Sequence, residues 1–401
     1  MADIPPSEFQ AMSMVLPDES VLGDAVAVMP DLQTAVPLAK AAYYREDWLR
    51  TEINHLFAGG WLFVGTATEL AENNSFVTLD LPGIALVVQN FRGELRAFQN
   101  ICTHRFNRIQ TEERGRRPLM CGYHAWNFDK TGFPVGRPKR DQYPADTPDT
   151  RERLCLPRYR VERCGAFVFV DMSGSAPSLA DYLGDVAGEL ETISEAMGEE
   201  IRFASVSHAA NWKLLVENVL ECYHCAAVHP ETFIGGLGIG HHPIRDVAVT
   251  GGNSSCHFPR AEIKRENLRR KILSHLAERT YAHESFFHIY VFPNLFISSQ
   301  EGLTFYIGQA LPTDARHTML RTRVYEPKIA FSQGGRSRQD MLNQQSIEIA
   351  ARVIEEDRAV LEAVQRGLEV STKPGVLGAE EVRIAAFFDH YRARMPDLPS
   401  A

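Results

Sequence analysis

Hydrophobic and polar positions divide the chain into two stretches with different periods. From Trp61 to about Val170, short runs rich in β-branched and aromatic residues, such as Ile84–Gln89 and Ala166–Val170, are separated by turn pairs such as Pro-Gly and Arg-Gly. Short strands joined by tight turns predict a small, mostly antiparallel β domain, which we place at residues 46–175.

The second stretch has a helical period at both ends and a β pattern between them. Helix-length segments follow Pro177, β-type runs lie between His283 and Leu311, and a long helix is predicted from about Arg338 to Leu368. This order predicts an α+β domain at residues 176–401, in which an antiparallel sheet packs under helices in a helix-grip-like arrangement. Residues 1–45 are rich in Pro, Asp and small residues, and we expect an arm that leads into the first helix.

Composition limits the possible functions. The 401 residues carry 42 Lys and Arg against 51 Asp and Glu, a net charge of −9, which disfavours a nucleic-acid partner. The apolar stretches are too short to cross a membrane, and the first residues lack the pattern of a signal peptide. Seven cysteines, an odd number, are expected as reduced thiols or metal ligands. We therefore expect a cytoplasmic enzyme, with any metal site serving chemistry rather than folding.

Two Cys and two His in the predicted β domain have the spacing of a metal site. Cys102 and His104 form one short segment, and Cys121 and His124 form another after 16 intervening residues. Thiolates stabilise ferric iron more strongly than neutral imidazoles do, so two Cys on one iron and two His on the other predict an asymmetric [2Fe-2S] cluster. Trp126 would shield it from water. Zinc uses the same residue types but usually pairs like with like along the chain, so it is the competing interpretation.

A second group of metal-binding residues lies within residues 211–230. We predict a helix here, on which Glu221 and His224 share a face. Pro230 disfavours helical backbone at the residue before it. The helix is therefore predicted to end near His229, which can fold back toward His224.

The predicted long helix supplies a third ligand. Its apolar stripe, with steps of three and four residues, is interrupted by Asp357. A carboxylate on a buried stripe is costly unless a cation or hydrogen bonds compensate it. Together, His224, His229 and Asp357 would form a facial triad on a mononuclear Fe(II), with positions left open for O2 and substrate.

The same residues have other interpretations. Glu221 fits a solvated helix charge, and Asp357 fits an ion pair with Arg358. Cys222 and Cys225 could hold zinc together with the two histidines, or could simply pack in the core.

The chain resembles the oxygenase (alpha) component of Rieske non-haem iron oxygenases from about Trp48 to Leu368. Its first motif, Cys-x-His-x16-Cys-x2-His, is similar to the Rieske cluster motif, although Phe106 stands where many members carry Gly. The Asp357 candidate falls in the family's Glu-Asp pair. The second motif matches the family pattern at Glu217, Asn218, Glu221, Tyr223, His224 and His229.

This resemblance implies cofactors and partners. The cluster and the Fe(II) would receive electrons from NAD(P)H through a separate flavin or iron-sulfur reductase, with O2 as co-substrate. Family members are usually head-to-tail homotrimers, in which Glu221 would bridge His224 of its own chain to His124 of the next. Asn218 and Tyr223 would then lie beside the iron.

The segment from Glu221 to Pro230 is also similar to the branch of carnitine, glycine betaine and stachydrine oxygenases. This likeness implies a small-molecule substrate, with N-demethylation of a quaternary ammonium compound as the leading hypothesis. Alternatives are an aromatic-ring hydroxylating mono- or dioxygenase and, in another class, a Rieske electron carrier or redox sensor that uses the cluster alone. Several aromatic residues could form a cation-π cage or plain core: Phe286, Phe287, Tyr290, Phe292, Phe296, Phe305 and Tyr306.

Overall fold

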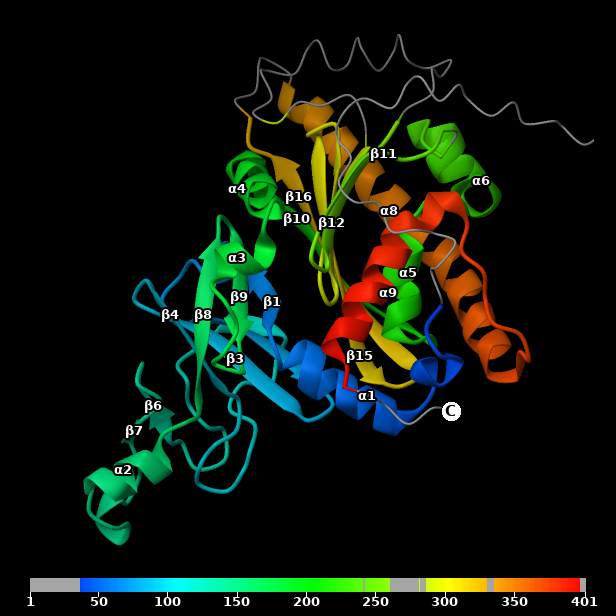
Figure 1. The fold of residues 1–401 in the computed structure, drawn as a ribbon. Coiled ribbons are helices and arrows are strands. Elements are labelled where there is room, and N and C mark those ends of the chain that lie inside the picture. Colours follow the sequence, from blue (N-terminus) through cyan, green and yellow to red (C-terminus); the bar gives the residue numbers. More distant parts are fainter. Residues whose placement is uncertain (1–36, 241, 260–280, 282–285, 330–334, 397–401) are drawn as a thin grey trace, which may run out of the picture.

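The computed structural model describes residues 37–240, 242–259, 281, 286–329 and 335–396, so most of the predicted N-terminal arm lies outside the described residues. Within them the chain forms two large antiparallel sheets with flanking helices, and a smaller two-stranded hairpin (Figure 1). The predicted α+β class is confirmed.

The first sheet is built from the N-terminal half of the chain. Its strands follow the order β1-β9-β8-β4-β3-β2-β5, and each pairs antiparallel with its neighbours. The apolar runs noted in the sequence form β3 and β9. The hairpin of β6 and β7 and the helix α2 extend away from the second sheet (Figure 1). The bounds are β1 (Trp61–Thr66), β2 (Ser75–Leu81), β3 (Ile84–Phe91), β4 (Glu94–Gln99), β5 (Arg114–Arg116), β6 (Asn127–Phe128), β7 (Pro134–Gly136), α2 (Pro148–Leu154), β8 (Arg158–Cys164) and β9 (Phe167–Asp171).

The second sheet has the order β10-β16-β15-β14-β13-β12-β11. Because side chains alternate along a strand, its two faces have different roles. On one face, residues such as Phe287 and Ile307 share a core with Leu190 and Ile193 of α4 (Val186–Ala196). The bounds are β10 (Met197–His208), β11 (Arg245–Thr250), β12 (Asn253–Phe258), β13 (Phe286–Val291), β14 (Leu295–Gln300), β15 (Thr304–Asp314) and β16 (His317–Pro327).

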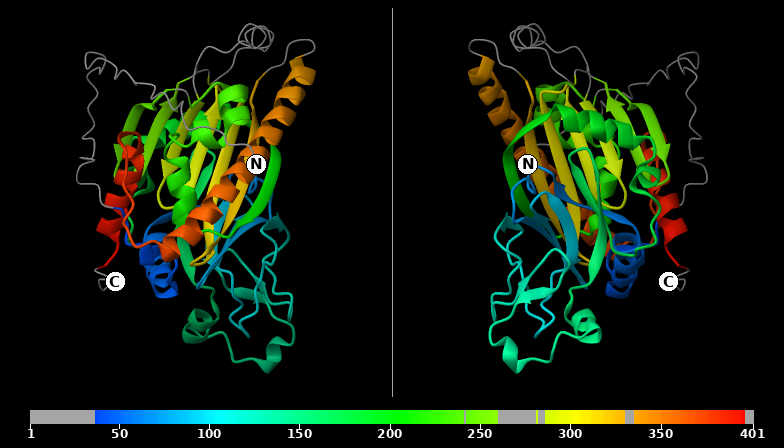
Figure 2. Two further views of the ribbon diagram at one scale, coloured as in Figure 1. Left: turned by 90° about the vertical axis from the view of Figure 1, so that its right-hand side faces the viewer. Right: turned by 90° about the vertical axis from the view of Figure 1, so that its left-hand side faces the viewer.

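Helices from the C-terminal half cover the other face of this sheet (Figures 1 and 2). The long helix predicted from the apolar stripe is confirmed as α8, which runs diagonally across the strands (Figure 2). The bounds are α1 (Glu46–Glu52), α3 (Leu179–Leu183), α4 (Val186–Ala196), α5 (Trp212–Val219), α6 (Cys225–Val228), α8 (Gly335–Val370) and α9 (Val382–Arg394), with π-helices η3 (Ile53–Phe57) and η5 (Pro230–Leu237) and 3-10 helices η2 (Lys40–Tyr43), η4 (Arg140–Gln142) and η6 (Ala379–Glu381).

The single helix predicted over residues 211–230 is wrong. Helix α5 ends at Val219, and Glu221 lies in a turn before α6 begins. The Glu221 carboxylate accepts hydrogen bonds from the backbone N–H groups of Tyr223 and His224, which removes donors that a continuous helix needs. The predicted end near His229 is confirmed, because α6 ends at Val228 and His229 leaves the helical region with φ −118° and ψ 44°, before Pro230 begins η5.

A buried ion pair anchors α5 to the N-terminal segment. Lys213 Nζ donates to Glu52 Oε1 at 2.6 Å, and both side chains are fully buried. The second Glu52 oxygen accepts from Trp212 Nε1 at 2.8 Å, and Tyr391 of α9 donates to the first. Residues 46–52, which we assigned to the first domain, therefore contact helices of the second, and α5 is held from two sides.

Candidate metal centres and cavity

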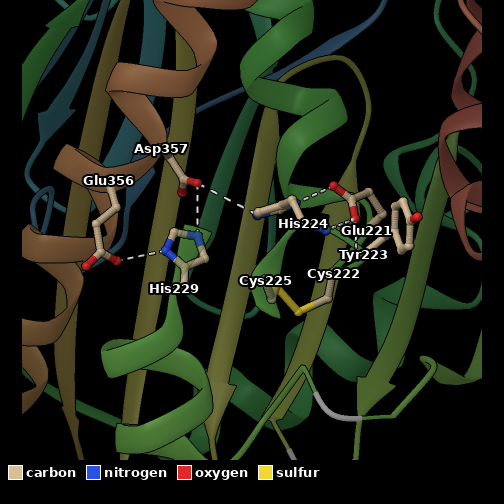
Figure 3. Close-up of a disulfide and its surroundings, with 8 residues drawn as sticks. All are labelled: Glu221, Cys222, Tyr223, His224, Cys225, His229, Glu356 and Asp357. Carbon is tan, nitrogen blue, oxygen red and sulfur yellow. Dashed lines mark hydrogen bonds and ion pairs between the residues drawn. A yellow bond between two sulfur atoms is a disulfide. The ribbon is translucent and has the colours of Figure 1, made fainter. Parts of the chain in front are cut away.

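Three side chains from two parts of the chain converge beneath α8 (Figure 3). His224 precedes α6, His229 follows it, and Asp357 lies on α8. The Asp357 Oδ1 atom is 3.0 Å from His229 Nε2 and 3.7 Å from His224 Nε2. One candidate ligand atom from each residue lies within 4.8 Å of the others. The structure thus brings together the three residues that the sequence suggested as a facial triad.

Carboxylates behind the two histidines orient their rings. His229 Nδ1 lies 2.8 Å from Glu356 Oε2, and His224 Nδ1 contacts Glu221 Oε1. A carboxylate is only an acceptor, so each neutral imidazole carries its proton on Nδ1 and directs the Nε2 lone pair toward Asp357. The role of Glu356 was not predicted from the sequence, although its place directly before Asp357 could have indicated it.

The donor set fits a divalent iron. His229 Nε2 and Asp357 Oδ1 are buried and have no hydrogen-bond partner among the described residues. Two lone pairs that face each other across 3.0 Å require a cation or a proton between them. Burial lowers the pKa of His229, but the Asp357 and Glu356 carboxylates outweigh it and raise the pKa above its usual value, so the site attracts positive charge. Two imidazoles and one carboxylate are the ligands of the facial triad.

The four cluster candidates lie on two loops of the same shape. In each loop the Cys N–H donates to the carbonyl five residues later, at 2.9 Å for Cys102 and 2.8 Å for Cys121. The residue four positions after each Cys donates back to its carbonyl and has a positive φ, 60° at Phe106 and 56° at Ala125. This conformation explains why glycine suits position 106, where Phe106 instead adopts the left-handed region.

The side chains of these loops fit a [2Fe-2S] cluster. Cys102 and Cys121 are each 1% exposed, and the rings of His104 and His124 lie 4.5 Å apart between centroids. Burial, and then the neighbouring Cys121 sulfur, raise the pKa of Cys102 to about 11, so two thiolates here require a compensating metal. Trp126 is 1% exposed and stacks on His104 at 4.7 Å, as expected for a shielding residue.

A cavity of about 160 Å³ opens beside the three converging side chains. Asn218 and Glu221 line it, whereas Tyr223 does not. The Tyr223 side chain is 73% exposed and points away from Asp357 (Figure 3), so in a single chain it does not reach the triad. Of the candidate aromatic residues, Phe286, Phe296 and Tyr306 line the cavity, and Phe296 also belongs to a core cluster. Phe287 and Phe305 pack in the core with α4, whereas Tyr290 and Phe292 pack in the core beside α9.

The expectation of reduced cysteines fails at one pair. Cys222 and Cys225 form a disulfide across the turn that carries His224 (Figure 3). Their Cα atoms are 5.0 Å apart because the break after α5 brings the two residues to the same side of the turn. A zinc site that uses both thiolates is therefore incompatible with this structure. The other five cysteines are free.

Two protein-family models match the chain and show which family it belongs to. Residues 60–159 match the Rieske [2Fe-2S] domain, and residues 195–397, half of the chain, match the ring hydroxylating alpha subunit (catalytic domain). The chain is a Rieske non-haem iron oxygenase alpha subunit. Membership in this family implies a [2Fe-2S] cluster and a mononuclear iron, and it leaves the electron-carrier alternative without support.

Curated relatives of this oxygenase subunit share part of their length with it. The carnitine monooxygenase oxygenase subunit of Escherichia coli (strain K12) is 32% identical over 224 residues, 55% of this chain and 58% of the relative. The glycine betaine monooxygenase oxygenase subunit of Pseudomonas aeruginosa (strain UCBPP-PA14) is 29% identical over 196 residues, 48% of this chain and 45% of the relative. The matches thus span about half the length of these relatives.

Solved structures share the fold over nearly the whole chain. The quaternary ammonium Rieske monooxygenase in complex with L-carnitine has a TM-score of 0.70 at 22% identity, with 90% of this chain and 96% of that chain covered. A naphthalene 1,2-dioxygenase with bound indole has a TM-score of 0.70 at 21% identity, with 90% and 92% covered. Among the described residues, every helix is too short or too polar to span a membrane.

Proposed function

We propose that this oxygenase subunit hydroxylates an N-methyl group of a small quaternary ammonium compound, using O2 and electrons from its reductase. The observation that carries the proposal is the triad of His224, His229 and Asp357 beside an aromatic-lined cavity. Relatives named for carnitine and glycine betaine support the substrate class. A further relative, from Sphingobium sp. (strain YBL2), is named an N,N-dimethyl phenylurea N-demethylase subunit alpha and is 28% identical over 218 residues.

In this proposal the two sites divide the chemistry. Residues 46–175 form the cluster domain, with Cys102, His104, Cys121 and His124 as ligands, and residues 176–401 form the catalytic domain. When bound, the cluster and the iron supply one-electron transfer and O2 activation. The protein holds the iron with only three side chains, so that positions stay open, and the aromatic wall holds the substrate near them.

The chain's own residues control where protons and charges lie during this reaction. Glu221 and Glu356 keep the Nδ1 protons on His224 and His229, so that both Nε2 atoms stay available as ligands. Asn218 lies in the cavity wall and can orient a polar group near the iron. Hydroxylation of an N-methyl carbon gives a carbinolamine, which breaks down to formaldehyde and the demethylated amine.

Electron transfer between chains would require a homotrimer. Exposed aromatic side chains flank both centres: Phe106 and Tyr123, 80% and 54% exposed, lie on the cluster loops, and Tyr223 lies beside Glu221. Burial of such side chains favours association. In a head-to-tail trimer Glu221 would connect His224 to His124 of the next copy, and Tyr223 would serve as a contact residue there. A flavin or iron-sulfur reductase would deliver NAD(P)H electrons to the cluster.

The test is substrate-dependent O2 uptake with a surrogate reductase, over a panel of quaternary amines and aromatic acids. The proposal predicts formaldehyde in step with O2 consumption for an N-methylated ammonium compound. The Asp357→Ala variant should make no formaldehyde while the visible absorption of its cluster is unchanged. Uptake that no quaternary amine stimulates would contradict the substrate class.

Aromatic-ring hydroxylation is the second candidate. The cavity wall is mostly apolar, with Leu215, Ile239, Ile349 and Leu361 beside the aromatic rings, which also suits an uncharged ring. This activity would yield a phenol or dihydrodiol without formaldehyde, so the same panel distinguishes the two.

A further inference from the structure

Arg383 is a buried cation close to the cavity wall. It lies in the first turn of α9 and is 1% exposed. Its guanidinium donates to neutral acceptors: Ser254 Oγ at 3.0 Å, Cys256 Sγ at 3.0 Å and His288 Nδ1 at 3.0 Å. Among the described residues no carboxylate lies within ion-pairing distance. A buried charge without a partner of opposite sign is costly, which points to a role for the charge itself.

The contact with Arg383 determines the tautomer of His288. A guanidinium has only donors, so His288 Nδ1 must accept and the ring proton must lie on Nε2. Burial, and then the charge of Arg383, hold the pKa of His288 well below its usual value. The ring is therefore neutral, and its Nε2–H is a fixed donor.

This donor has no partner among the residues that the structure describes. His288 is 4% exposed and lines the cavity, and its Nε2 is buried without a hydrogen bond to any described residue. A buried donor left without an acceptor costs about 1–3 kcal/mol. Another buried histidine of the cavity, His208, has the opposite arrangement, because its Nδ1 faces the Val206 carbonyl at 3.2 Å and leaves Nε2 as an acceptor.

A row of aromatic rings connects this donor to the metal ligands. Phe233 packs on His229 with centroids 4.8 Å apart, and Phe286 lies 6.0 Å from Phe233. Phe258 follows at 5.7 Å from Phe286, and its ring is 6.1 Å from His288. The wall thus begins at a metal ligand, continues with π faces that attract a quaternary ammonium, and ends at an N–H donor backed by a cation.

We infer that His288 anchors a carboxylate of the substrate, with Arg383 as the positioning residue behind it. The inference rests on the proposed function for the ammonium end of the substrate. It adds that the opposite end of the substrate carries a carboxylate. The substrate is then a zwitterion: its N-methylated ammonium lies on the aromatic wall toward the iron, and its carboxylate accepts the His288 Nε2–H. The positive charge of Arg383 favours an anion at this end and repels a second cation. The charge of Glu189 acts on Arg383 from a distance, but its carboxylate accepts a hydrogen bond from Ser255 Oγ at 3.2 Å rather than from the guanidinium.

The test compares binding of matched ligands by titration calorimetry to the anaerobic, iron-loaded enzyme. One pair is a trimethylammonium carboxylate with a three-carbon spacer and its primary amide; the second pair is an aromatic acid and its amide. The wild type should bind the carboxylate of the ammonium pair about 10- to 100-fold more tightly than the amide. His288→Phe, which keeps a ring between Phe258 and Phe296, should abolish that preference.

Two further variants separate the hydrogen bond from folding and from charge. His288→Gln can accept from Arg383 and still donate to the ligand, so it should retain most of the preference. Arg383→Gln keeps a donor toward His288 Nδ1 without the charge, and its preference should fall between wild type and His288→Phe. His208→Phe is the matched control and should keep the preference, and unchanged cluster absorption serves as the folding check.

The outcomes distinguish the two proposals. Equal binding of carboxylate and amide by the wild type, or an equal loss with both ligands in His288→Phe, overturns the anchor. If only the aromatic acid binds, with the same dependence on His288, the anchor stands and the quaternary ammonium proposal fails. Binding of neither pair overturns both.

Discussion

Each proposed histidine ligand of the mononuclear iron, His224 or His229, depends on a carboxylate for its orientation. Glu356 accepts from His229 Nδ1 at 2.8 Å and also from Thr232 Oγ1 at 2.8 Å. Such partners fix the ring and raise its basicity as a ligand. Glu355, the preceding residue, instead pairs with Arg358 on the surface of α8.

This difference predicts opposite effects for two adjacent substitutions. Glu356→Ala should weaken Fe(II) binding at the mononuclear site by about 10- to 100-fold, because His229 loses its Nδ1 partner. Glu355→Ala is the control and should bind iron as the wild type does. Fe(II) titration of anaerobic protein, with the cluster intact, measures both; equal affinities in the two variants would contradict this role of Glu356.

A second prediction at this scale concerns pH. Burial raises the pKa of Glu217 from 4.5 to about 7, although Tyr43 donates to it at 2.6 Å. The native state therefore holds a proton that the unfolded state has released, so the free energy of unfolding falls as pH rises from about 4.5 to about 7 and stays lower above that. Glu217→Gln removes this loss and still accepts from Tyr43. Between pH 5 and pH 8, we expect the free energy of unfolding of the variant to rise by about 2 kcal/mol relative to that of the wild type, measured by thermal unfolding at each pH.

At the scale of elements, local patterns predicted more than the connections between elements. The apolar stripe predicted α8 and marked Asp357 as a carboxylate on an apolar helix face. The Cys and His spacing predicted the two cluster loops. The break after α5 was missed, because it arises from a side chain, Glu221, that competes for backbone N–H groups. The disulfide between Cys222 and Cys225 follows from that break. Hydrophobic periodicity predicts neither the break after α5 nor the disulfide.

The turn between α5 and α6 gives the prediction at this scale. Glu221→Gln keeps an oxygen that can accept from the backbone and from His224 Nδ1, so both metals should remain bound. It removes the carboxylate charge beside the His224 proton. In single-turnover experiments that start from a reduced cluster, we expect cluster oxidation to slow by tenfold or more. Unchanged oxidation kinetics would show that Glu221 has no part in electron transfer.

The whole molecule brings together residues that no local pattern connects. Arg383 and His288 are 95 positions apart and meet only because α9 packs against the strands of the second sheet. Likewise, Phe106 has a φ of 60° and is 80% exposed, two features that a single chain gives no reason to combine. A contact with a neighbouring copy would supply the reason.

Substitution of Phe106 by glycine tests that interpretation. Phe106→Gly relieves a left-handed conformation that costs about 1 kcal/mol, so the isolated chain should not be destabilised. It should nevertheless weaken the trimer. In sedimentation velocity, the variant should dissociate at protein concentrations at which the wild type is still a trimer. Arg92→Gly is the matched control, since Arg92 also has a positive φ, 56°, at an exposed hairpin away from the cluster loops. Equal association of both variants would contradict a contact at Phe106.

The central claim is that one chain holds two chemically distinct iron centres. Iron and labile sulfide analysis of anaerobically prepared protein, supplied with ferrous salt, tests it most directly. We predict about three irons and two sulfides per chain in the wild type, and about two of each in Asp357→Ala. Two irons per chain in both proteins would contradict the account.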